Sequence, residues 1–269
     1  MDDASADAHV KPYWETLPPG ATAEVPGLDG LTHRPLVMLV EEKPDSNVID
    51  TDEPTFLLYE DGTVLYHRVT NDGAPGEAMR ADIGATGAQA VADELVKLGV
   101  LDLPNVDGLG SDEPRVELFV RLGARWHEAI VYGASRANLS RDGRAPPAFF
   151  TAYRRLATYQ APGATTWSPD EIEIHVWGGA PGSRAPAWPD PLPRLPAPLK
   201  PQPETHVEVV PGTYEPTVRA FKRPDGGYNM RVNLDGFDWM FDYIRRVPEE
   251  AYVRKVRDAR WRFAPRDAQ

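Results

Sequence analysis

One serine of this chain lies in a spacing close to that of a hydrolase nucleophile. Gly133-Ala134-Ser135-Arg136-Ala137 follows a predicted strand. A nucleophile elbow has a second glycine where this chain has Ala137, because the turn packs tightly there. The next residues are typical of a loop, whereas an elbow leads into a helix. The pattern therefore predicts an ordinary strand end and no activated serine.

Histidines are a second source of chemistry, as metal ligands or as acids and bases. None of the six has the spacing of a metalloprotease. Three lie on predicted strands: His67, His127 and His175. His67 and His127 each share a face of their strand with apolar residues, whereas His175 shares a face with Glu173 and Trp177 that we expect to be solvated. The three need not converge, so we expect no metal site.

Acidic residues cluster near the N-terminal end, at Asp45, Asp50, Asp52 and Glu53. A calcium loop of the EF-hand type requires glycine at its sixth position, where this tract has Asp50. A solvated acidic loop is the better interpretation. The chain also lacks a glycine-rich phosphate loop and has no cysteine, which excludes disulfides, thiol catalysis and iron–sulfur clusters. We therefore expect no cofactor.

The overall charge restricts the kind of partner. The 269 residues include 41 acidic and 29 basic side chains, a net charge of −12. A broad phosphate-binding surface is therefore excluded, and we expect no nucleic-acid partner. No apolar run is long enough to span a membrane, and the acidic start is unlike a secretory signal. We expect a cytoplasmic protein as the sequence stands, and an extracytoplasmic one if a leader was removed.

The charge is unevenly distributed, which points to a protein partner of unidentified nature. Residues 1–53 carry 12 acidic and 3 basic side chains, whereas residues 245–267 carry eight basic and four acidic ones. The acidic N-terminal segment or an acidic face of the domain could neutralise the basic end inside the molecule. Alternatively, these regions could bind a partner together with aromatic side chains. The candidate partner-binding residues are Glu41, Glu42, Asp50, Asp52, Glu53, Arg254, Arg257, Trp177 and Trp188.

The elements that would position these residues predict an α+β fold. A strand is expected over residues 36–40, and hairpins over 56–69 and 116–132. One helix begins near Thr86 with a capping-box spacing to Gln89 and ends at Gly99. A second helix begins at Pro146, and a strand over 171–177 closes this part. Successive hairpins favour an antiparallel sheet with two packed helices.

The remainder is divided by a proline-rich stretch. Residues 180–203 contain nine prolines, which predicts a linker or a strap on the surface. Beyond it we expect a strand over 207–210, a hairpin over 217–234, a helical piece over 237–246 and a final helix from Pro248. The predicted organisation is an extended segment (1–34), an α+β domain (35–178), the strap (179–204) and a small C-terminal α+β region packed on the domain (205–269).

Three short motifs resemble a family of uncharacterised bacterial proteins, some of them envelope lipoproteins. The motifs are Asp61-Gly62-Thr63-Val64, Ser111-Asp112-Glu113-Pro114 and Trp167-Ser168-Pro169-Asp170, within residues 55–178. The resemblance implies no activity and transfers no functional residue. It does raise an envelope location as a possibility, although this chain lacks the lipidation cysteine.

These observations favour a non-catalytic protein-binding module, such as an acidic neutraliser or adaptor for a basic partner. A charged surface accelerates encounter with an oppositely charged one. Two alternatives stay open: a hydrolase with an unrecognised carboxylate and histidine site, and an envelope structural protein. The sequence does not specify the oligomeric state.

Overall fold

The computed structural model describes residues 17, 20, 22–41, 53–69, 75–106, 115–132, 145–193, 205–220 and 230–259. The fold is α+β, as predicted. In these residues twelve strands form two antiparallel sheets of eight and four strands, and four α-helices accompany them. Short 3-10 helices are also present: η2 (Leu28–Gly30), η3 (Val100–Asp102) and η4 (Gly212–Tyr214).

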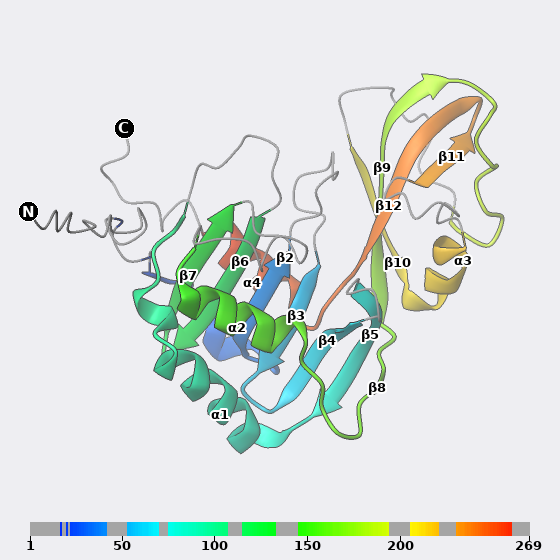
Figure 1. Ribbon diagram of the computed structural model, residues 1–269. Helices are drawn as coiled ribbons and strands as arrows, with labels where there is room; N and C mark the ends of the chain where they lie inside the picture. The colour runs from blue at the N-terminus through cyan, green and yellow to red at the C-terminus, as the bar shows by residue number, and fades with distance from the viewer. Residues whose placement is uncertain are drawn as a thin grey trace, which may run out of the picture.

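The larger sheet is built mainly from hairpins (Figure 1). Its spatial order is β1 (Thr22–Glu24), β7 (Arg125–Tyr132), β6 (Arg115–Leu122), β2 (Pro35–Glu41), β3 (Pro54–Tyr59), β4 (Thr63–Val69), β5 (Pro75–Asp82) and β8 (Thr165–Thr166). Both predicted hairpins of this sheet are confirmed. Gly62 turns β3 into β4 at φ 96°, a backbone conformation that glycine adopts without steric cost.

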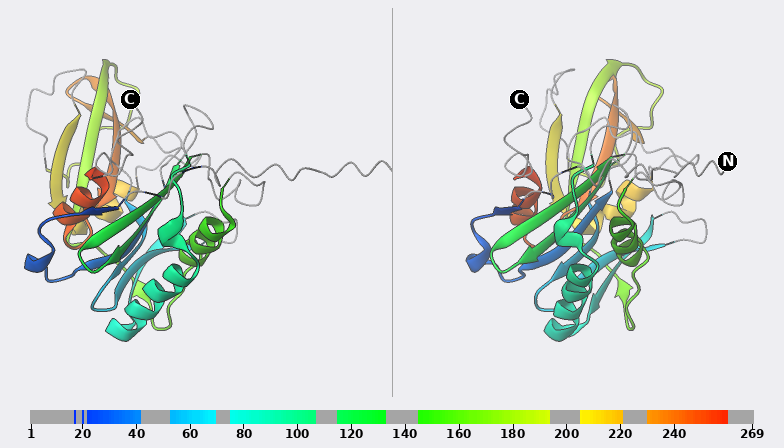
Figure 2. Two further views of the ribbon diagram at one scale, coloured as in Figure 1. Left: turned by 90° about the vertical axis from the view of Figure 1, so that its left-hand side faces the viewer. Right: turned by 60° about the vertical axis from the view of Figure 1, so that its left-hand side comes forward.

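Helices cover both faces of the larger sheet (Figure 2). On one face lie α1 (Gly84–Lys97) and α2 (Pro147–Ala157), over the larger of two apolar clusters. On the other face lies α4 (Glu250–Asp258). The indole N–H of Trp126 donates to the Tyr252 hydroxyl at 3.1 Å, and that hydroxyl donates to the Val25 carbonyl at 3.2 Å. The C-terminal helix is therefore part of the core of the larger sheet.

The apolar stripe predicted for α1 is confirmed, but its start is not. Ala88, Val91, Ala92 and Leu95 are buried against the sheet. The helix begins at Gly84, two residues before the predicted start, and no side chain caps its first turn. The Gly84 N–H is instead bonded to the Asp82 carboxylate at 2.8 Å. Gly99 ends the helix at φ 82°, as predicted.

The smaller sheet stands beside the larger one (Figure 1). Its order is β10 (His206–Pro211), β9 (Glu171–Pro181), β12 (Phe237–Arg245) and β11 (Met230–Leu234). The strand that we expected to close the first domain therefore pairs with the C-terminal strands. One face of this sheet is apolar: Ile174, Val232, Trp239 and Phe241 lie there with other buried side chains.

Two predictions for the C-terminal region are wrong. Residues 237–246 were expected to be helical, but 237–245 form β12, because Trp239 and Phe241 alternate onto the buried face of a strand. Residues 217–219 were expected to begin a strand, but they belong to the short helix α3 (Glu215–Arg219). The hairpin turn is Asp235-Gly236, with φ values of 53° and 83°, and it lies nearer the C-terminus than predicted. Residues 221–229, which include the predicted turn, lie outside the described ranges.

The proline-rich stretch is a strap against the smaller sheet as far as Pro193. The Trp188 N–H donates to the Asn233 carbonyl at 2.9 Å, and the Asn233 N–H donates to the Pro186 carbonyl at 2.6 Å. The Asp238 carboxylate accepts hydrogen bonds from the backbone N–H groups of Arg184 and Ala185. The two bonds at Asn233 lie on the outer edge of β11, so the strap pairs there with a strand that would otherwise be an open edge.

Candidate functional site

Charged side chains meet where the two sheets join. The Arg245 guanidinium contacts the Glu53 carboxylate at 2.6 Å and the Glu215 carboxylate at 2.7 Å. Arg219 pairs with Glu215 one helical turn away, and the His67 imidazole lies 2.9 Å from Glu53. Glu53 directly precedes β3 and His67 lies on β4 of the larger sheet, and the other three belong to the smaller sheet and its helix. We call these five side chains the inter-sheet cluster.

The charges of the inter-sheet cluster compensate each other. Burial alone would lower the pKa of Arg245, but the carboxylate of Glu53, and further that of Glu215, raise it above its ordinary value. The guanidinium is therefore fixed in its charged form between two carboxylates. Two arginines face two glutamates, so the net charge of these four side chains is zero. Because charge-assisted hydrogen bonds are directional, the cluster also orients the two sheets.

A second charged group joins α4 to the smaller sheet. Arg254 contacts Glu173 at 2.7 Å and Glu250 at 2.8 Å, and His175 lies 2.9 Å from Glu173. Burial alone would raise the pKa of Glu173, but hydrogen bonds from His175 and Arg254 lower it to about 2. The prediction that Glu173 and His175 face solvent is wrong: they are 4 % and 6 % exposed. The sequence pattern missed this because the counter-charge comes from a helix 81 residues away.

Several residues proposed to bind a partner have contacts inside the molecule. Glu53 and Arg254 belong to the two groups above. Arg257 is buried with its Nε 3.7 Å from a Glu117 carboxylate oxygen. The Tyr153 hydroxyl donates to Glu41. Glu53, Arg254 and Arg257 therefore have counter-charges inside the molecule, as the interpretation of internal neutralisation expects, whereas Glu41 accepts from a neutral hydroxyl group. The remaining acidic candidates, Glu42, Asp50 and Asp52, lie outside the described residues.

The two candidate tryptophans lie on different parts of the smaller sheet. The Trp188 ring packs edge-on against Phe241 at 5.7 Å, and its indole N–H donates to the Pro193 carbonyl at 3.2 Å. Trp188 thus fixes the strap. Trp177 is half-buried on β9, and its buried indole N–H has no hydrogen-bond partner in the part of the chain that the structure describes. No further contact assigns a role to Trp177.

The histidines on strands do not converge. His67 lies at Glu53, and His175 lies at Glu173. His127 is on β7, at the other end of the larger sheet, where burial and the charge of Arg125 lower its pKa. No group of three or more potential metal ligands occurs among the residues the structure describes. The serine motif at 133–137 lies outside those residues.

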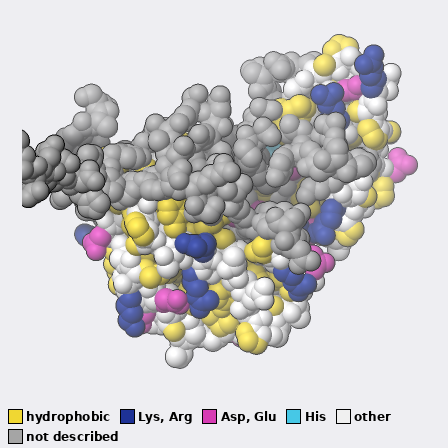
Figure 3. Space-filling view, in the orientation of Figure 1, with side chains coloured by type: hydrophobic (Ala, Val, Ile, Leu, Met, Phe, Trp, Pro, Cys, Tyr) yellow, Lys and Arg dark blue, Asp and Glu magenta, His cyan; other side chains and the backbone are white. Residues whose placement is uncertain are grey.

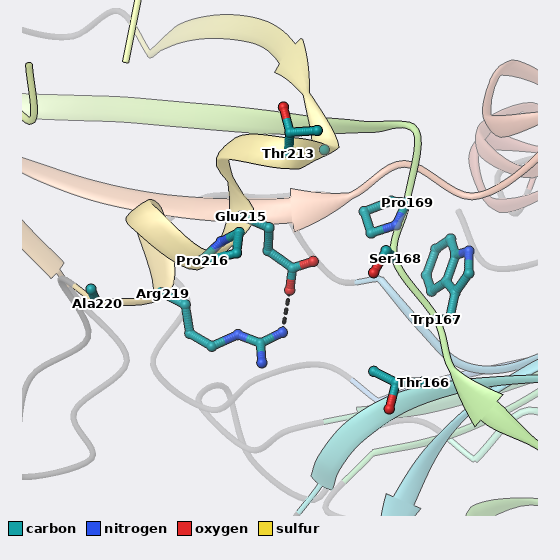
Figure 4. A pocket seen from close by; sticks show the side chains of 10 residues that line it. Thr166, Trp167, Ser168, Pro169, Thr213, Glu215, Pro216, Arg219 and Ala220 are labelled. Carbon is teal, nitrogen blue, oxygen red and sulfur yellow. Dashed lines mark hydrogen bonds and ion pairs between the residues drawn. The ribbon is translucent and has the colours of Figure 1, made fainter. Parts of the chain in front are cut away.

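A pocket of about 710 Å³ opens beside the inter-sheet cluster (Figure 4). One wall is the β8–β9 connection, residues 166–169, and the other is formed by Gly212, Thr213 and α3. Glu215 and Arg219 project into the space between these walls. Gly212 permits the close approach of the walls, because a Cβ atom there would lie 1.8 Å from the Pro169 carbonyl oxygen. No histidine lines this pocket.

The edges of the two sheets differ in how they are protected. An open edge strand presents unpaired backbone groups to any passing strand, and proteins shorten or cover such edges. In the larger sheet, β1 has three residues and β8 has two. In the smaller sheet, β11 is covered by the strap. The fourth edge, β10, has six residues, and none of the described strands pairs with its outer side.

The geometry of β10 shows which of its backbone groups face outward. The Gly212 N–H donates to the Asp170 carbonyl at 2.7 Å, in the same register that pairs β10 with β9. In an antiparallel pair, bonded and non-bonded residue pairs alternate. The backbone groups of Val207 and Val209 therefore point away from β9. Their side chains are also exposed, at 49 % and 41 %, and they share one face of the strand.

The rest of the described surface offers less for recognition. Figure 3 shows hydrophobic, basic and acidic side chains interspersed over α1, α2 and the smaller sheet, so acidic groups form no single patch on this face. No described helix is long and apolar enough to cross a membrane. No family model, curated protein or solved structure matches the chain. The geometry above is therefore the basis for a functional proposal.

Proposed function

We propose that this protein is a non-catalytic binding module that takes up an extended segment of a basic protein partner along β10. The observation that carries the proposal is the contrast among the four sheet edges: three are short or covered, and β10 is long and open among the described strands. Recognition by strand addition obtains affinity from backbone hydrogen bonds and specificity from alternate side chains.

The chemistry of β10 specifies the partner segment. Its outward N–H and C=O groups at Val207 and Val209 would bond an added strand, and the two exposed valines would contact apolar side chains on one face. Glu208 is half-buried on the opposite face and would pair with a cation. The net charge of −12 also favours encounter with a cationic partner. The segment is therefore one in which apolar and basic residues alternate.

The hydrolase alternative has less support. A hydrolase of this type requires a histidine and a carboxylate that a substrate can reach. In the pairs His67–Glu53 and His175–Glu173 the side chains are largely buried and the carboxylates are held by Arg245 and Arg254. The pair His33–Asp61, at 2.6 Å, is partly exposed, but it lies at the β3–β4 turn and neither residue lines the pocket. No contact among the described residues favours the other alternative, an envelope structural protein.

A capture experiment with paired variants tests the proposal. The tagged protein would be incubated with a lysate of its source organism, and stoichiometric partners would be quantified by mass spectrometry. Val207→Pro with Val209→Pro removes both outward N–H groups but no bond to β9, since those groups face away from it. The matched control, Val207→Thr with Val209→Thr, retains the N–H groups and the β-branched shape.

The proposal predicts a partner captured by the wild type and the threonine variant and lost by the proline variant. A peptide of alternating Lys and Val should displace that partner, and one of alternating Glu and Val should not. Equal capture by the proline variant, or no stoichiometric partner for the wild type, would overturn the proposal. Far-UV circular dichroism and the melting temperature would establish that the proline variant is folded.

A further inference from the structure

Glu215 presents one oxygen to the pocket beside α3. The side chain is 5 % exposed, and its Oε1 atom carries the bonds from Arg219 and Arg245 and a 3.4 Å contact with the Tyr243 hydroxyl. None of these contacts involves the Oε2 atom. In Figure 4 this second oxygen points toward Ser168 and Pro169, across the pocket. A carboxylate oxygen that faces a pocket can accept a hydrogen bond from a ligand that carries a donor group.

Donors lie beside this acceptor. Arg219 is half-exposed, is hydrogen-bonded to Glu215 and Tyr243, and lines the pocket with a guanidinium that has five N–H donors in all. A carboxylate and a guanidinium fixed side by side can bind two adjacent hydroxyl groups of a ligand. One hydroxyl donates to the carboxylate, and the other accepts from the guanidinium. Hydroxyl side chains of Thr166, Ser168 and Thr213 also line the pocket and can do either.

The remaining lining is flat and apolar. Trp167 lies on the wall formed by the β8–β9 connection, and prolines stand on both walls at Pro169 and Pro216. The indole also packs against the apolar cluster beneath α4, which fixes its position. The face of an indole packs well against the C–H groups of a ligand ring, and the polar side chains around the indole can bond the polar groups of that ligand. The volume of about 710 Å³ is within the range of small-molecule sites.

The charge of the site selects against ionic ligands. Glu215 and Arg219 neutralise each other, and Arg245 is balanced by Glu53. A ligand with a net charge would therefore find no uncompensated partner. We propose that this pocket binds a neutral saccharide, with the hydroxyl pair on Glu215 and Arg219 and the ring on Trp167. This site is separate from the outward groups of β10 and does not depend on the function proposed above.

Saturation-transfer NMR and calorimetry of the full chain test the proposal. The probes would be glucose, N-acetylglucosamine and cellobiose, with glucuronate and glucosamine as charged counterparts. We expect a neutral member to bind with a Kd of about 1 mM, and Arg219→Gln and Trp167→Leu each to weaken it at least about tenfold. The matched control is Arg231→Gln, an exposed arginine of the smaller sheet that does not line the pocket.

The outcomes separate clearly. Loss of binding in both pocket variants, with Arg231→Gln and the Val207→Pro, Val209→Pro variant unchanged, would support a saccharide site. The proposal would be overturned if no neutral probe bound at a concentration of about 10 mM, tenfold the expected Kd. It would also be overturned if the pocket variants bound a neutral probe as tightly as the wild type does, or if a charged probe bound more tightly than the neutral ones. Melting temperatures of the variants would show whether a loss of binding is a loss of folding.

Discussion

The larger sheet holds α4 by apolar contact, whereas the smaller sheet is held at its junction by charge. Tyr252, Val253 and Val256 of α4 pack into a buried cluster with Trp126 and other side chains. At the junction, the inter-sheet cluster of Glu53, His67, Glu215, Arg219 and Arg245 joins the two sheets. Apolar burial stabilises without direction, while ion pairs are directional and vulnerable to the loss of one partner.

The apolar contact and the charged contact have different consequences for stability and for the arrangement of the two sheets. A buried ion pair contributes little net stability compared with an apolar substitute, because both charges lose their hydration. We therefore expect the apolar side chains of α4 to contribute more to stability there than the buried contact of Arg257 with Glu117. The inter-sheet cluster instead fixes how the smaller sheet stands against the larger one, and it places Glu215 and Arg219 at the pocket.

The largest effect is expected from removing the central cation of the cluster. Arg245→Ala leaves Glu53 and Glu215 buried without their shared partner, which should cost about 3–5 kcal/mol in the free energy of unfolding. Urea denaturation would measure it. The triple variant Arg245→Met, Glu53→Gln, Glu215→Gln removes the charges together and should recover a large part of this loss. If the triple variant were less stable than Arg245→Ala, the cluster would contribute net stability, and the comparison above would be wrong.

An intermediate effect is expected from pH at the second charged group. The pKa of Glu173 falls from its ordinary 4.5 to about 2 in the folded protein. Its contribution to stability is therefore complete above pH 4.5 and is lost as the pH falls toward about 2. Glu173→Gln should have a lower melting temperature than the wild type at pH 7. The difference between the two melting temperatures should disappear as the pH falls from 4.5 to about 2.

Glu171→Gln is the matched control for the pH experiment, because Glu171 is exposed on the same strand and pairs with Arg246. Its melting temperature should follow that of the wild type at every pH. Calorimetry from pH 2 to pH 7 would measure all three proteins. A constant gap between wild type and Glu173→Gln would contradict a lowered pKa for Glu173.

The smallest effect is expected from an exposed ion pair of the larger sheet. Arg125 and Glu24 lie 3.3 Å apart, and each side chain is 66 % exposed. Arg125→Ala should therefore change the free energy of unfolding by less than about 0.5 kcal/mol. Measured beside Arg245→Ala in the same urea titration, it would separate the effect of burial from that of charge. A loss comparable to that of Arg245→Ala would show that exposure does not distinguish the two pairs.

Local signals in the sequence predicted most of the larger sheet. The hairpin at Gly62 depends on turn chemistry within four residues, and the stripe of α1 depends on neighbouring helical turns. The strand 237–245 was missed because its aromatic residues were given more weight than their alternation. The turn Asp235-Gly236 before it was a signal for a hairpin that could have corrected this prediction. The pairing of β9 with β10 and β12 joins distant segments, and no local pattern encodes it.

The candidate site was less accessible from the sequence. Glu53 and Arg254 were selected by charge alone, and charge does not show whether a counter-ion lies elsewhere in the chain. Glu53 contacts a residue 192 positions away. The open edge at β10 follows from sheet order, and the pocket follows from the meeting of two connections. Val207, Val209, Glu215 and Arg219 are ordinary residues for a strand and a helix, so only the fold distinguishes them.

The position of α4 has a consequence for biosynthesis. Of the described elements it is the last to leave the ribosome, yet it covers one face of the sheet that contains Leu57, Phe119 and Trp126. While the smaller sheet is being translated, that apolar face lacks its helix. Exposed apolar strands favour aggregation, so we expect a chain that terminates before residue 250 to aggregate more readily than the full chain.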